Sequence, residues 1–221
     1  MHKLSFADVF SFAAPTVEVK VGQPATSFFV NSDLLSATPD YFKTALKQEW
    51  REGKMRVVDL PTDPVDAFNC YMNWVHNKTI VLGYNDGQDP VLENNFDPLA
   101  DAYALGDKLL DGDFKDAVID ALVVSMNTKD ESDNYVLPGA ARRTQLYDRT
   151  VEGSTARRLL AYRFARANKS MLKNEDCHPF LLDVACEAIN KGSETTNAAA
   201  ARCAFHEHVP GAQHCYRSKY T

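Results

Sequence analysis

The side chains best suited to chemistry gather near the end of the sequence. Five cysteines and histidines lie within thirteen positions there: Cys203, His206, His208, His214 and Cys215. Thiolate and neutral imidazole are the ligands that zinc prefers, so the segment is a candidate metal site. Its spacing matches none of the paired knuckles of structural zinc sites, although Pro210-Gly211 is suited to folding the two halves together. A disordered or loosely packed tail competes with this hypothesis, and the sequence alone assigns no metal ligand.

A second candidate is a set of carboxylates along one predicted helical region. A calcium loop needs ligands at odd positions, a glycine at the sixth and a distant bidentate glutamate. This segment lacks that register, which favours capping of helix ends and a solvated helix face. The carboxylates are Asp107, Asp111, Asp113, Asp116 and Asp120.

A nucleophile, a base and an orienting acid are present at Cys177, His178 and Asp183. The first two are adjacent, so their side chains point in different directions, and both lie at a predicted helix start. The sequence has no nucleophile elbow, phosphate loop, glycine-rich dinucleotide turn or metalloprotease helix. We therefore expect no enzyme activity, no catalytic residue and no cofactor.

Basic and apolar residues are interleaved between positions 157 and 169. Such a helix can lie on a membrane or bind a partner. It can equally lay arginine stems over an apolar stripe that packs on an acidic domain, and we favour this interpretation. The basic residues are Arg157, Arg158, Arg163, Arg166 and Lys169, interleaved with Leu159, Leu160, Tyr162 and Phe164.

Composition places the chain among globular proteins. Of its 221 residues, 45% are hydrophobic and 24% are charged, which is enough apolar material for a core. No run approaches the ~18 apolar residues of a membrane span, and Met1 to Pro15 does not resemble a signal peptide. The five cysteines are odd in number and scattered. We expect reduced thiols and a location in the cytoplasm or nucleus, not secretion.

The charge is distributed unevenly along the chain. Residues 1–139 hold 11 basic and 22 acidic residues, whereas residues 140–221 hold 13 basic and 8 acidic ones. The change falls beside a polar loop, which suggests two structural units whose opposite charges help them to dock. Nucleic-acid binding by the basic part is not favoured, because no finger or aromatic stacking signature accompanies it.

The first half of the chain is predicted to form a small mixed α/β unit. Thr16–Val21 and Thr26–Val30 predict a hairpin, Met55–Leu60 a third strand and Thr79–Leu82 a fourth. Helices are predicted after Asn31, from Tyr41, after Asp63-Pro64 and after Asp97-Pro98. Gly106 in the last of these helices is tolerable if another backbone approaches closely there. The helix Phe114–Met126 is apolar around much of its girth, which predicts packing on more than one side. Turn chemistry is expected at Asn85-Asp86-Gly87.

Beyond the polar loop the patterns are helical. We expect helices at Ala140–Tyr147, Ser154–Ala167 and Pro179–Ile189. The last stretch, from Ser193, is weakly patterned. The fold class is thus α+β: a small sheet flanked by a helical cluster, followed by an all-α extension.

Several of these segments resemble a BTB/POZ domain, in the order and spacing of that family. The resemblance covers roughly residues 16–126, and no single motif in it is diagnostic. The general character of the sequence, including the segment from Tyr147 to Leu160, is similar to that of short BTB proteins of filamentous fungi. The matching phrases are Val19-Lys20-Val21-Gly22, Phe29-Val30-Asn31-x-x-Leu34-Leu35, Tyr41-Phe42, Val57-Val58-Asp59-Leu60-Pro61, Asp63-Pro64 with Phe68, Tyr71, Trp74 and Val75, and Tyr103-x-Leu105-Gly106-Asp107-Lys108-Leu109 with Phe114-Lys115.

The chain departs from the family pattern in two places. Asn31 stands where these domains usually carry a histidine before the paired leucines. Met1 to Pro15 is too short for the extra strand and helix that swap between subunits in the longest members. The second departure puts a swapped dimer in doubt and leaves the fold expectation untouched.

The resemblance implies a protein–protein interaction module that self-associates, often as a homodimer. It also implies a possible role as substrate adaptor for a cullin-based ubiquitin ligase, with an unknown protein substrate. A dimerising scaffold without a cullin, or a transcription-related regulator with a zinc-binding tail, is the alternative. We expect an interaction domain at 16–126, a polar linker at 127–139, a helical extension at 140–192 and a weakly ordered tail at 193–221.

Overall fold

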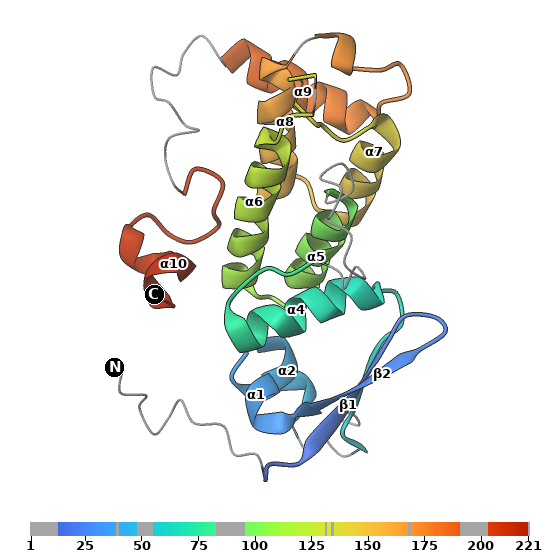
Figure 1. Cartoon of the computed structure of the whole chain (residues 1–221), viewed down its shortest axis with the longest axis vertical. Coiled ribbons are helices and arrows are strands. Elements are labelled where there is room, and N and C mark those ends of the chain that lie inside the picture. Colours follow the sequence, from blue (N-terminus) through green and yellow to red (C-terminus); the bar gives the residue numbers. More distant parts are fainter. Residues whose placement is uncertain are drawn as a thin grey trace.

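The computed structural model describes residues 13–38, 40–47, 55–82, 96–130, 132–133, 135–167, 169–190 and 203–220, and combines a small sheet with many helices (Figure 1). The α+β fold expected from the sequence is therefore confirmed. The predicted turn at Asn85-Asp86-Gly87 lies outside the described residues. In chain order the elements are β1 (Thr16–Val21), β2 (Thr26–Asn31), α1 (Ser32–Ser36), α2 (Asp40–Ala45), β3 (Val57–Leu60), α4 (Val65–Asn77), α5 (Phe96–Lys108), α6 (Gly112–Asn127), α7 (Ala140–Arg149), α8 (Thr155–Arg166), η3 (Lys169–Met171), α9 (His178–Asn190), η4 (Ala212–His214) and α10 (Tyr216–Lys219).

Three strands form the sheet of the described residues, in the order β2-β1-β3. β2 pairs with β1 antiparallel and β3 pairs with it parallel, so the predicted hairpin and third strand are confirmed. Alternate residues of β1, namely Val17, Val19 and Val21, are buried, as period-two patterning requires. The predicted strand at Thr79–Leu82 is wrong: these residues follow α4 as irregular chain and pair with neither edge of the sheet.

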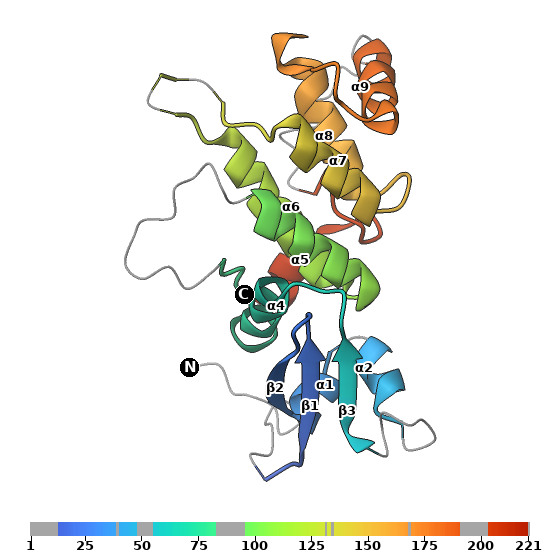
Figure 2. The ribbon, with the colours of Figure 1, turned by 90° about the vertical axis from the view of Figure 1, so that its right-hand side faces the viewer.

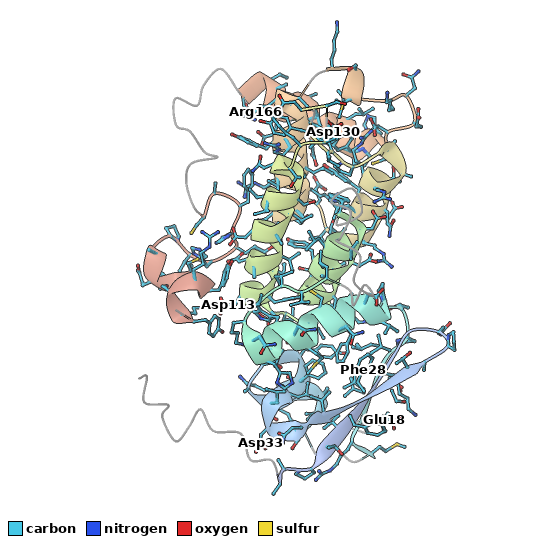
Figure 3. All side chains as sticks on the ribbon, viewed as in Figure 1. Glu18, Phe28, Asp33, Asp113, Asp130 and Arg166 are labelled. Atoms are coloured by element: carbon cyan, nitrogen blue, oxygen red, sulfur yellow. The ribbon has the colours of Figure 1, made fainter. Side chains whose placement is uncertain are left out.

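The helices α1, α2 and α4 cover one side and one end of the sheet (Figure 2). The side chain of Asn31 caps α1 by accepting hydrogen bonds from the backbone N–H groups of Asp33 and Leu34. Phe28 of β2 packs edge-on against Phe68 of α4, with ring centroids 4.9 Å apart (Figure 3). Phe29, by contrast, is 71% exposed and lies on the opposite face of the sheet.

The helices α5 and α6 form an antiparallel pair beyond α4. Gly106 allows their close approach, because a Cβ atom there would lie 2.9 Å from both Phe114 and Lys115 of α6. The sequence suggested the close approach of another backbone at Gly106, whereas the groups that approach it are the side chains of Phe114 and Lys115. α6 also packs against α8 and α10. This agrees with the apolar residues that the sequence places around much of the circumference of this helix.

The helical extension, α7 to α9, packs on α5 and α6 at the end of the molecule away from the sheet (Figure 1). Among the described residues, two ion pairs join the helices α7 to α9 to the acidic first half: Arg142 with Asp97 at 3.0 Å, and Arg149 with Asp101. The opposite charges of the two halves therefore do contribute to docking, as the charge distribution suggests.

The C-terminal segment, residues 203–220, runs back from the extension along α6 towards α4 (Figures 1 and 2). It contains η4 and α10, and Tyr216 packs on Trp74 of α4 with ring centroids 5.4 Å apart. The sequence predicts weak order here, whereas the structure gives this part defined contacts. The contacts join residues about a hundred positions apart, so no local pattern announces them. Residues 191–202 lie outside the described ranges.

Candidate metal centre

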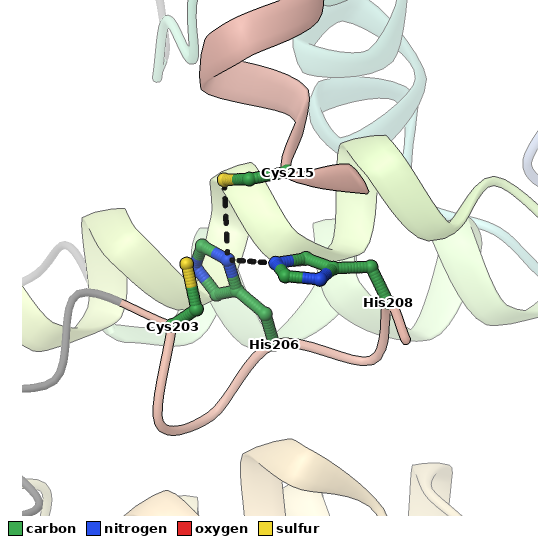
Figure 4. Close-up of side chains that lie close together, drawn as sticks. All are labelled: Cys203, His206, His208 and Cys215. Carbon is green, nitrogen blue, oxygen red and sulfur yellow. Dashed lines mark hydrogen bonds between the residues drawn. The ribbon is translucent and has the colours of Figure 1, made fainter. Parts of the chain in front are cut away.

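Four of the five cysteines and histidines near the C-terminus meet at one point (Figure 4). Cys203, His206, His208 and Cys215 each offer one ligand atom, and these four atoms all lie within 4.8 Å of one another. They are two imidazole nitrogens and two sulfurs, a donor set that suits a zinc ion. Both cysteines are free thiols.

The local fold of the C-terminal segment brings the two halves of the cluster together. A backbone hydrogen bond from His206 to the carbonyl of Cys203, 3.2 Å long, closes the first turn. The chain then reverses at Gly211, whose φ of +123° is a conformation that side chains with a Cβ atom rarely adopt. The single turn η4 follows and returns Cys215 to the first pair. The reversal expected at Pro210-Gly211 is thus confirmed.

The fifth candidate ligand, His214, is not part of the cluster in the described structure. It is exposed, whereas its neighbour Cys215 is 4% exposed. Adjacent residues on a tight turn point in different directions, so only one of the two can face inward. The sequence could not choose between them, because both are good zinc ligands.

Two aspartates of α6 hold His206. Its Nε2 atom lies 3.0 Å from Oδ1 of Asp120. A carboxylate only accepts hydrogen bonds, so Nε2 carries a proton, and in the neutral imidazole Nδ1 keeps the lone pair. Burial alone would raise the pKa of Asp120, but hydrogen bonds from His206 and Tyr216 hold that pKa below its usual value.

Asp116 supports the same loop one helical turn earlier. Its Oδ1 atom accepts a hydrogen bond of 2.7 Å from the backbone N–H of Glu207. Its Oδ2 atom is buried, lacks a hydrogen-bond partner among the described residues and lies 3.9 Å from Nδ1 of His206. Desolvation raises the pKa of this carboxyl group. An unsatisfied carboxylate oxygen therefore borders the cluster.

His208 is oriented by the backbone of the next residue. Its Nδ1 atom lies 2.8 Å from the carbonyl oxygen of Val209 and must donate to it, which leaves the lone pair on Nε2. This Nε2 atom faces Nδ1 of His206 at 3.3 Å. Sγ of Cys215 approaches the same Nδ1 atom at 3.7 Å. The lone pairs of both imidazoles thus point into one small space.

The acidic residues of α5 and α6 are engaged by protein groups, and they do not converge on an ion site within the described residues. Asp111 caps α6 through the backbone N–H of Phe114, as expected for helix-end capping. The sequence analysis did not predict that Asp113, Asp116 and Asp120 bind the C-terminal segment. Their i, i+3, i+7 spacing, which places them on one helix face, was the available signal. The partners are Lys115 for Asp107, Phe114 and Tyr71 for Asp111, Lys219 for Asp113, Glu207 for Asp116 and His206 for Asp120.

The group Cys177, His178 and Asp183 does not assemble as a nucleophile, a base and its orienting acid. Asp183 accepts a hydrogen bond of 2.7 Å from the hydroxyl of Tyr147 instead. His178 begins α9, as its position before the apolar stripe suggests.

Three arginines of the basic segment bind groups of the protein itself. Arg163 donates to the carbonyl of Met126 on α6 at 2.6 Å, and Arg157 stacks on Tyr147 with its guanidinium carbon 4.5 Å from the ring centre. Arg166 lies over the ring of Tyr162 at 3.5 Å. These contacts agree with stems that pack on the protein. No helix within the described ranges is long and apolar enough to cross a bilayer.

A scan of the chain against protein-family models found no match, and a search of curated proteins found no similar sequence.

Proposed function

We propose that the chain is a protein–protein interaction module of the BTB/POZ type that associates with a second copy of itself. The observation that supports this most is the order of elements around β1. The segments that resemble the family form the hairpin β1–β2, the strand β3 parallel to β1, the helix α4 and the paired helices α5 and α6. These elements follow one another in the order read from the sequence, and this order supports the proposal.

The open face of the sheet offers a surface for self-association. Phe29 stands on this face with Glu18 as its neighbour on β1. β2 pairs only with β1 among the described residues, so its outer edge presents backbone groups to a partner. Exposed aromatic side chains commonly anchor protein interfaces. We assign Phe29 and the edge of β2 to the contact between two copies.

In this proposal the module works by proximity and performs no chemistry of its own. A dimer that holds two other proteins raises their effective concentration for each other. The more specific form of the proposal is a substrate adaptor: one surface binds a cullin scaffold and another surface, for example on the helical extension, binds the substrate.

A binding titration against the N-terminal domain of the BTB-type cullin tests the adaptor role, with the mass of the purified full chain in solution measured in parallel. Micromolar or tighter binding, roughly −8 kcal/mol or better, by a dimer supports it. A dimer that does not bind the cullin removes the ligase role and leaves a dimerising scaffold. A strict monomer without cullin binding contradicts both forms of the proposal.

A further inference from the structure

We propose that Cys203, His206, His208 and Cys215 bind one zinc ion, which fastens the C-terminal segment to the rest of the protein. The ligand atoms are the two Sγ atoms, Nδ1 of His206 and Nε2 of His208. Binding releases the two thiol protons to solvent, since the thiolate is the ligating form. This site is independent of the interaction surface on the sheet.

The two imidazoles direct nitrogens toward each other. Asp120 fixes the proton of His206 on Nε2, and the carbonyl of Val209 fixes the proton of His208 on Nδ1. In the neutral imidazoles the remaining nitrogens therefore face each other as two lone pairs only 3.3 Å apart. Two acceptors at this distance repel unless a positive charge lies between them. A shared proton would remove the repulsion between the two nitrogens only. A metal ion would also bind the nearby thiols of Cys203 and Cys215.

The spacing of the donor atoms fits a tetrahedral ion. Zinc–nitrogen bonds of about 2.0–2.1 Å and zinc–sulfur bonds of about 2.3 Å, at tetrahedral angles, separate two nitrogens by about 3.3 Å and a nitrogen from a sulfur by about 3.6 Å. The observed separations are 3.3 Å between His206 Nδ1 and His208 Nε2, and 3.7 Å between His206 Nδ1 and Cys215 Sγ. All four atoms lie within 4.8 Å of one another, so a tetrahedral ion fits after small side-chain movements.

Protein groups behind the ligands hold both histidines. A zinc-binding histidine usually donates its other N–H group to a carboxylate or a backbone carbonyl, and both histidines here do so. The buried Oδ2 atom of Asp116, unpartnered among the described residues, lies 3.9 Å from the ligating nitrogen of His206. This oxygen is a further acceptor beside the ligand atoms.

The consequence of zinc binding follows from what the segment touches. Glu207, between the two histidines, accepts a hydrogen bond of 2.7 Å from Tyr103 of α5 and pairs with Lys115 of α6 at 2.6 Å. Tyr216, just after Cys215, packs on Trp74. α10 spans only four residues, which is too short to be a stable helix by itself. The ion therefore joins short pieces that could not hold their geometry alone.

The metal content of the full chain is the primary test. Protein expressed in zinc-supplemented medium and purified in the presence of a reducing agent is expected to carry one zinc ion per chain. After removal of zinc by a chelator, cobalt(II) chloride serves as the probe. A cobalt spectrum with strong tetrahedral ligand-field bands and a thiolate charge-transfer band is expected, because the ligands are two sulfurs and two nitrogens.

Ligand variants and matched controls locate the site. Cys215→Ser and His208→Ala are each expected to weaken zinc binding by more than about 100-fold, since even the groups behind zinc ligands contribute about 10–100-fold. His214→Ala and Cys186→Ser serve as controls, because His214 is exposed and lies outside the cluster and Cys186 is an exposed thiol on α9. Both controls should keep the full zinc content.

Three results would overturn the proposal. The wild-type chain could contain no zinc and show no tetrahedral cobalt spectrum, a result that does not depend on any variant folding. Mass analysis of freshly purified protein could find Cys203 and Cys215 joined in a disulfide. The control variant His214→Ala could lose as much zinc as His208→Ala, which would mean that the ligands are not those assigned.

Discussion

His206 donates a hydrogen bond of 3.0 Å from Nε2 to Asp120, a residue 86 positions earlier in the chain. This contact joins the loop that carries most of the candidate zinc ligands to the middle of α6. It also fixes which nitrogen of His206 is free to bind a metal. One carboxylate on a long helix thus orients a ligand that belongs to a distant segment.

Replacement of Asp120 by Asn tests this relationship. The amide is a weaker acceptor and no longer favours a single imidazole orientation, so zinc affinity should fall by about 10–100-fold. Competition with a chromophoric chelator measures it. Asp113→Asn is the control. Asp113 lies on the same helix as Asp120 (Figure 3) but accepts a hydrogen bond of 2.8 Å from Lys219 of α10 and is not part of the cluster. Equal losses in both variants would contradict an orienting role for Asp120.

Removal of zinc should loosen the C-terminal segment and leave the sheet intact. Amide hydrogen exchange within residues 203–220 is expected to rise by at least about tenfold after chelation, because the short pieces lose their common anchor. Exchange in β1 should not change, since β1 is held by β2 and β3. Added zinc should restore protection. Unchanged exchange in the segment of verified metal-free protein would show that the ion does not hold it.

Arg143 and Asp176 form a buried ion pair in the helical extension, with side chains only 2% and 0% exposed. Arg143 also donates to the carbonyl of Pro138 at 2.6 Å and lies over the ring of Phe164. Arg143→Met strands the buried carboxylate, so the free energy of unfolding should fall by about 3–5 kcal/mol.

The neighbouring residue provides the control for this experiment. Arg142 pairs with Asp97 at the surface, where both side chains are about one-third exposed. Arg142→Met should therefore cost no more than about 1 kcal/mol. Urea denaturation of both variants measures the difference. Similar losses in the two variants would mean that burial does not decide the contribution of Arg143.

Gly106→Ala should destabilise the protein in spite of the better helix propensity of alanine. The new methyl group would lie 2.9 Å from Phe114, a fully buried ring. Overpacking costs about 1–3 kcal/mol and the propensity gain returns up to about 1 kcal/mol, so a net loss in the free energy of unfolding is expected. Gly112→Ala is the control, because no atom lies within 4 Å of the added carbon. A thermal denaturation midpoint that rises for Gly106→Ala would refute the close contact.

Phe29→Ser should weaken self-association without loss of stability. Phe29 is 71% exposed, so its removal leaves no cavity in the chain but deletes the apolar anchor of the proposed contact. Light scattering across a concentration series should show a shift towards monomer. Leu182→Ser, on α9 and 54% exposed, removes a comparable apolar group from the extension. A dimer that survives Phe29→Ser but not Leu182→Ser would place the contact on the extension.

The sequence by itself determined the local elements. Alternation of apolar residues in Thr16–Val21 specifies a strand with one buried face, and this holds because a strand presents successive side chains to opposite sides. Asn31 and Asp111 cap helices where their sequence position indicates. These features depend on neighbours a few residues away, which is why a linear pattern reveals them.

Tertiary structure alone decided the rest. Thr79–Leu82 has the residues of a strand, but a strand forms only where the tertiary structure brings the segment alongside a partner strand, and these residues instead follow α4 as irregular chain. The choice of Cys215 over His214 as a member of the cluster, and the defined course of residues 203–220, depend on Asp116, Asp120 and Trp74, which lie far away in the sequence. A short polar segment has too little local preference to fix its own geometry, so only the surface on which it packs determines it.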